Sequence, residues 1–80
     1  GKLSYADLVY KYVKASESIS REELIQEIVN AKHGESSEKV ARNVRTAISN
    51  AKGRDHIEET GEILTLKKHD ELETQWELST

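Results

Sequence analysis

The side chains best suited to acid–base catalysis or metal binding are three histidines and two pairs of adjacent glutamates. They are His33, His56, His69, Glu22–Glu23 and Glu58–Glu59. A zinc site needs three or four converging ligands, but these histidines fall in three different segments and the chain has no Cys to assist them. Adjacent residues point apart on helices and strands alike, so the paired glutamates indicate capping and solubility. The sequence therefore predicts no enzyme activity, no metal and no cofactor.

A run of basic residues stands out in an otherwise acidic chain. Residues 39–54, KVARNVRTAISNAKGR, contain five Lys or Arg and no Asp or Glu. The chain as a whole carries −3, so the other 64 residues carry −8. Charges opposite an apolar stripe are ordinarily just a solvated face. The complete lack of acids after Glu38 favours a nucleic-acid-binding face instead, because the distribution of charge matters more than its sum.

Three segments have the apolar spacing of amphipathic helices. The first is predicted over residues 5–15, with Ser4 as its N-cap. The second follows an S-x-x-E capping box that begins at Ser20, and the third begins after Ser36 or Ser37. The apolar stripes are formed by Tyr5, Leu8, Val9, Tyr12 and Val13 in the first helix, Leu24, Ile25, Ile28 and Val29 in the second, and Val40, Val44, Ala47, Ile48 and Ala51 in the third.

Two further segments have the character of strands. Ile19 lies among polar residues in SESIS, which suits a brief extended segment. Later, HIEETGEILTL contains two short β-prone runs on either side of Thr60-Gly61. A glycine at this point can adopt the positive φ that a tight hairpin turn requires. The pattern therefore predicts a β-hairpin after the third helix.

The resulting order is helix, short strand, helix, helix and hairpin. This order resembles the winged helix-turn-helix superfamily over about residues 4–66, by pattern and not by a diagnostic motif. The resemblance implies an α+β, mostly α fold, in which a three-helix core carries a short strand and a C-terminal β-hairpin wing. It also implies that ISREELIQEIV is the supporting helix, SEKVARNVRTAISNAK the recognition helix and IEETGEIL the wing.

Helical geometry places the positive charge of the third helix away from its apolar stripe, at about 100° per residue. We therefore expect residues 38–52 to contact the major groove of double-stranded DNA, which admits one α-helix. The expected base contacts are Arg42, Asn43 and Thr46. The expected phosphate contacts are Ser36, Ser37, Lys39, Arg45, Ser49, Lys52 and Arg54.

The predicted wing argues against this reading, because Glu58, Glu59 and Glu62 flank Gly61. A tip with three carboxylates would be repelled by DNA phosphates, whereas the wings of DNA-binding family members are basic. Either the wing is held off the duplex or the domain is a protein–protein interaction module. In the second case the acidic wing or the basic helix would dock a partner of opposite charge.

Eighty residues allow one compact domain. Residues 1–3 are interpreted as a tag remnant or linker, residues 4–66 as the domain and residues 67–80 as a tail that is either extended or forms a short helix. The chain lacks Met, so Gly1 is interpreted as a cleavage scar and the domain as one part of a larger protein. Besides double-stranded DNA, the rest of that larger protein is the expected partner.

The setting of the chain also follows from composition. With no Cys and no apolar run near 18 residues, we expect an intracellular domain, cytoplasmic or in the nucleoid or nucleus, with neither a membrane nor a small-molecule substrate as a partner. The sequence leaves the roles of two aromatic residues undecided. Tyr10 lies off the apolar stripe and Trp76 lies in the tail, so they either pack on each other or mark a partner surface.

Overall fold

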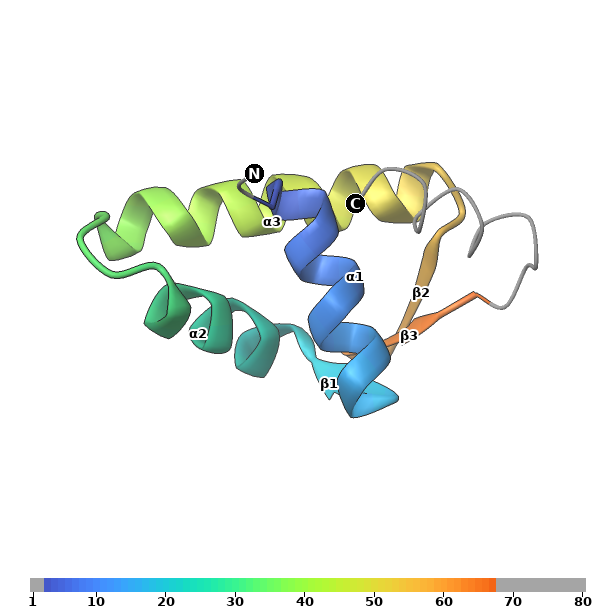
Figure 1. Cartoon of the computed structure of the whole chain (residues 1–80). Helices are drawn as coiled ribbons and strands as arrows, with labels where there is room; N and C mark the ends of the chain where they lie inside the picture. Colours follow the sequence, from blue (N-terminus) through green and yellow to red (C-terminus); the bar gives the residue numbers. More distant parts are fainter. Residues whose placement is uncertain (1–2, 68–80) are drawn as a thin grey trace.

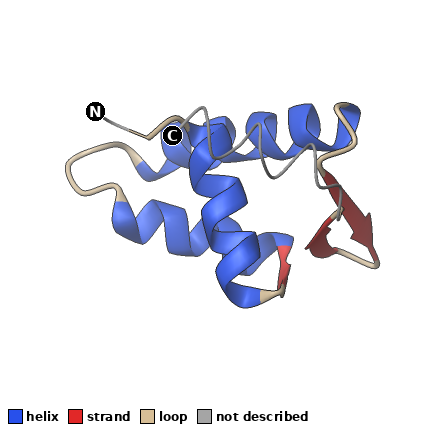
Figure 2. Cartoon of the chain, turned by 45° about the vertical axis from the view of Figure 1, so that its right-hand side comes forward, coloured by secondary structure: helices blue, strands red, loops and turns tan. Residues whose placement is uncertain are grey.

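The computed structural model describes residues 3–67 and shows three helices and a three-stranded sheet over this range. The elements are α1 (Tyr5–Ser16), β1 (Ser18–Ser20), α2 (Arg21–Ala31), α3 (Ser37–Gly53), β2 (Ile57–Thr60) and β3 (Ile63–Leu66). In Figure 1, α3 runs along one side of the molecule, and α1 and α2 pack against it. The hairpin of β2 and β3 lies at the end of α3 away from the α2–α3 loop, as Figure 2 also shows. This is the topology of a winged helix, as predicted.

A serine side chain begins each helix by satisfying a backbone amide that has no partner within the helix. Ser4 Oγ accepts from the amide of Asp7 at 3.1 Å, and the Asp7 carboxylate accepts in return from the amide of Ser4 at 3.2 Å. Ser20 accepts from the amide of Glu23 at 3.1 Å. Ser36 caps α3, with an Oγ distance of 3.4 Å to the amide of Lys39, so Ser37 is the first residue of the helix.

The three strands form an antiparallel sheet in the order β1-β3-β2. Ile19 pairs with Leu64 in the centre of β3, so the short strand between the first two helices ties them to the hairpin. Gly61 and Glu62 connect β2 to β3 with φ values of 55° and 69°. A two-residue turn with positive φ at both positions is the type I′ turn that fits the twist of a hairpin. The predicted hairpin and its turn are confirmed.

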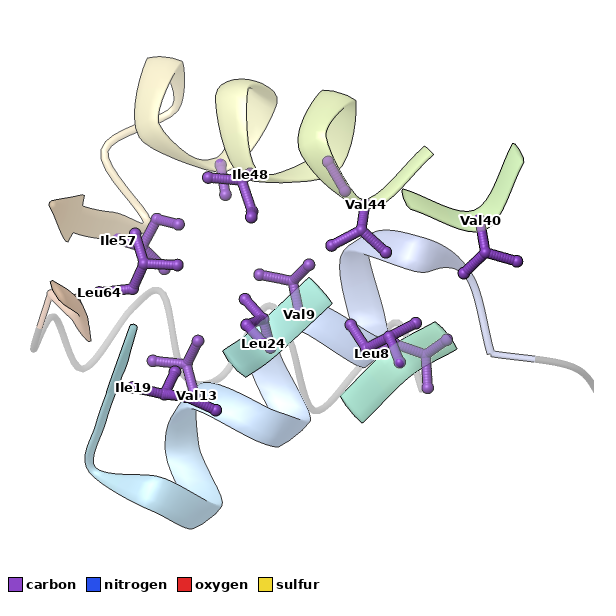
Figure 3. Packing of buried hydrophobic residues seen from close by; sticks show 13 residues of the cluster. Leu8, Val9, Val13, Ile19, Leu24, Val40, Val44, Ile48, Ile57 and Leu64 are labelled. Atoms are coloured by element: carbon purple, nitrogen blue, oxygen red, sulfur yellow. The ribbon is translucent and has the colours of Figure 1, made fainter. Parts of the chain in front are cut away.

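One apolar cluster lies where the helices and the sheet meet, and Figure 3 shows its side chains pointing toward one another. Eight of its members have less than 2% of their surface exposed: Leu24, Ile28, Ile48, Leu64, Val9, Val13, Val40 and Val44. Every helix and the central strand contribute to this group. The apolar stripes of the sequence predicted the helical members of this group, because amphipathic spacing places them on one side of each helix; Leu64 belongs to β3 and was in none of these stripes.

Tyr10 occupies a separate small cluster. Its side chain packs against Ala6 and Leu66, and only 9% of the residue is exposed. Tyr10 is therefore covered on the hairpin side of α1, and the interpretation of Tyr10 as an exposed marker of a partner surface is wrong. The residue with which it was expected to pack, Trp76, lies outside the described residues.

Replacing Ile28 with Ala should lower the free energy of unfolding by about 2–5 kcal/mol, because it leaves a cavity in the core. Chemical denaturation followed by circular dichroism would measure this. Ile63→Ala is the matched control, since Ile63 is 42% exposed whereas Ile28 is fully buried, and it should cost less than about 1 kcal/mol. Equal losses in the two variants would contradict the core described above.

Candidate nucleic-acid interface

Helix α3 presents a basic side to solvent. Its apolar residues Val40, Val44 and Ile48 are fully buried, so the residues on the opposite side of the helix are turned outward. The exposed residues there that were predicted to contact DNA form what we call the basic flank: Lys39, Arg42, Arg45, Thr46 and Ser49. The flank covers three turns of a helix that is 17 residues long.

The cations of the basic flank are not neutralised by carboxylates of the described chain. None of the salt bridges formed among residues 3–67 involves Lys39, Arg42 or Arg45. Among residues 3–67, these three positive charges therefore have no ion-pair partner. An exposed cation without such a partner breaks no ion pair when it binds an anion.

The three predicted base contacts are placed differently by the structure. Arg42 is exposed on the basic flank. The hydroxyl of Thr46 donates to the carbonyl of Arg42 at 3.1 Å, so this side chain has its oxygen lone pairs and its methyl group left for a ligand. Asn43 is half-buried and faces α1. Arg42 and Thr46 are thus exposed, whereas Asn43 is only partly accessible.

A groove of about 680 Å³ separates the first turn of α1 from α3. It is lined by Ser4, Tyr5, Ala6, Asp7, Asn43, Thr46, Ala47, Asn50, Ala51, Arg54 and His56. Thr46 lies at the border between this groove and the basic flank, and Arg54 lies at the groove's end near the hairpin. Asn43 and Arg54 are therefore displaced from the centre of the flank toward α1.

Lys52, another predicted phosphate contact, is engaged by an acid of the hairpin. Its Nζ donates to Glu59 Oε1 at 2.8 Å. Arg21, at the start of α2, holds the same carboxylate with two hydrogen bonds, from Nε to Oε2 at 2.9 Å and from Nη2 to Oε1 at 2.8 Å. The side chain of Glu59 is only 12% exposed. We call Arg21, Lys52 and Glu59 the ion cluster.

The ion cluster changes the titration of its acid. The hydrogen bonds from Arg21, and then the one from Lys52, lower the pKa of Glu59 from 4.5 to about 2. The same bond to Glu59 raises the pKa of Arg21. Glu59 is therefore a compensated anion that joins α2, α3 and the hairpin, and not a free charge of the wing.

Only two of the three expected wing carboxylates are thus exposed. Glu58 and Glu62 face solvent, and no salt bridge within residues 3–67 involves them. Sequence reasoning missed the role of Glu59, although a signal was present. Side chains alternate along a strand, so Glu59 shares a face with the buried Ile57, and an acid on that face needs partners.

The remaining candidates lie at the two ends of α3. Ser36 and Ser37 are exposed at its N-terminus, where helix amides favour anions.

His56, which follows the C-terminal end of α3, was considered as a metal ligand. Burial and then the charge of Arg54 lower the pKa of His56. Among residues 3–67, His, Asp and Glu form no group of three that could hold a metal ion.

Comparisons with known protein families, with curated proteins and with solved structures found no match to this chain. The class of the fold follows from the element order and sheet pairing described above. Within the described part of the chain, none of the helices has the length and apolar character needed to cross a bilayer.

The ion cluster predicts how stability depends on pH. The folded pKa of Glu59 is lowered to about 2, so its contribution is fully present above about pH 4.5 and is lost as the pH falls toward 2. Denaturant titrations from pH 5 to pH 2 should therefore show a steeper loss of stability in the wild type than in Glu59→Gln. Glu58→Gln, which removes an exposed neighbour, should keep the wild-type slope. Parallel profiles for the wild type and Glu59→Gln would show that the cluster does not exist in solution.

Proposed function

We propose that this domain binds double-stranded DNA by inserting the basic flank of α3 into the major groove. The observation that carries the proposal is the exposure of Lys39, Arg42 and Arg45, with no carboxylate partner among residues 3–67, on the side of α3 opposite the core. The winged-helix topology supports it, because this helix is the one that enters the groove in helix-turn-helix proteins. In this proposal the domain gives a larger protein its DNA contact and catalyses no reaction.

The proposal assigns separate tasks to the cations of α3. Arg42 reads a base edge, because a guanidinium can bind guanine O6 and N7 with two hydrogen bonds. Thr46 contributes an acceptor or a methyl contact next to it, and Asn43 reaches the duplex from the groove side. The phosphate contacts proposed along α3 and at its two ends are those expected from the sequence: Ser36, Ser37, Lys39, Arg45, Ser49, Lys52 and Arg54.

Binding of the chain to a mixed-sequence duplex, measured by fluorescence anisotropy at several salt concentrations, tests this function. With four cations on phosphates, Lys39, Arg45, Lys52 and Arg54, the slope of log K against log salt should be about −3.6. Arg42→Ala should weaken binding to the same duplex, by at most the roughly 5- to 150-fold (about 1–3 kcal/mol) that the loss of a base contact costs.

The matched control for Arg42→Ala is Lys11→Ala, which removes one exposed cation from α1. The two variants have the same net charge, so a loss confined to Arg42→Ala locates the binding surface on α3. Equal effects of both substitutions would contradict the proposal, as would a wild type that binds no duplex at low salt.

A protein-interaction module is the second candidate, and the exposed carboxylates of the hairpin favour it. Glu58 and Glu62 form an acidic wing surface that suits a basic partner and repels DNA. The two functions differ in a simple observable. A domain that binds a basic protein partner through its wing loses affinity when Glu58 and Glu62 are both changed to Gln, whereas one that binds DNA gains affinity.

A further inference from the structure

Within the ion cluster, Arg21 and Lys52 do not hold the Glu59 carboxylate equally. Among residues 3–67, only Arg21 donates to Glu59 Oε2, whereas Glu59 Oε1 accepts from both Arg21 and Lys52, each at 2.8 Å. Arg21 therefore holds the carboxylate at both oxygens, in the paired geometry that makes Arg–carboxylate contacts strong. Lys52 adds a single bond to an oxygen that already has a partner.

This inequality makes Lys52 the exchangeable member. If its ammonium moves away, Glu59 keeps two charge-assisted hydrogen bonds, so no buried anion is left without compensation. The Lys52 side chain is also the most exposed of the three, at 42% against 29% for Arg21 and 12% for Glu59. A flexible, single-point donor such as an ammonium changes partners more readily than a planar guanidinium.

Lys52 also lies where it could reach a DNA backbone. It is in the last turn of α3, one helical turn beyond Ser49, at the end of the basic flank that adjoins the hairpin. An oxygen of a DNA phosphate offers the same kind of acceptor as a carboxylate oxygen of Glu59. The carboxylate thus occupies, within the free protein, the ligand position that a phosphate would take.

We infer that Glu59 is an internal competitor of DNA, and that Lys52 leaves Glu59 for a backbone phosphate when the duplex binds. Because Arg21 keeps the carboxylate compensated, the free-energy cost of breaking the Lys52–Glu59 ion pair is small. This inference rests on the proposed DNA binding and adds a role for the hairpin acid, which sets the affinity of the site without touching DNA. Each binding event includes the breaking of one ion pair.

A double-mutant cycle on the full chain tests the exchange, with the same duplex and anisotropy readout. Glu59→Gln should tighten binding by about 2- to 5-fold, because Lys52 no longer has to leave an anion. In a Lys52→Gln background, Glu59→Gln should give no more than the general charge effect, measured by Glu58→Gln. Lys52→Gln alone should reduce the size of the salt slope by about 0.9, since one phosphate contact is lost.

The outcomes separate this inference from the proposed function. Equal gains from Glu59→Gln with and without Lys52 would overturn the exchange while leaving DNA binding intact, and so would an unchanged salt slope in Lys52→Gln. If neither the wild type nor Glu59→Gln binds a duplex at low salt, the proposed function itself fails. Thermal unfolding of each variant checks that it is folded at the temperature of the titration.

Discussion

The burial of one apolar stripe on α3 decides how this helix is rotated about its own axis. Val40, Val44 and Ile48 fill the centre of the core, and burying such a side chain contributes roughly 1.5–3 kcal/mol. A domain of this size has a total stability of only about 4–12 kcal/mol. Turning the stripe toward solvent would therefore cancel most of that stability. The basic flank points outward because the opposite, apolar side of α3 must stay buried in the core for the domain to remain folded.

Electrostatics then divides the cations of α3 into two groups. Lys39, Arg42 and Arg45 are exposed and are not engaged by acids of the described chain, whereas Lys52 is held by Glu59. The same carboxylate connects the start of α2 to the hairpin through Arg21. The hairpin is thus positioned by packing and by this ion cluster together, and one of its three acids is neutralised from within. This lessens the conflict between an acidic wing and the DNA contact that is proposed for α3.

The features that sequence reasoning could predict are those that depend on neighbours along the chain. Serine caps, apolar spacing and the Gly61 turn act within a few residues, so the elements and the core followed from them. The bond from Arg21 to Glu59 spans 38 positions, and only the folded chain brings these residues together. For the same reason the half-burial of Asn43 beside α1 was not predicted, because it depends on how two helices pack.

Backbone amide shifts recorded by NMR during titration with a short mixed-sequence duplex would locate the binding surface most directly. If α3 reads DNA, the largest shifts at low salt fall on the basic flank, around Lys39, Arg42 and Arg45, and diminish as salt is added. Shifts confined to Glu58 and Glu62 of the hairpin, or spectra that do not change at all, would contradict DNA recognition by this helix.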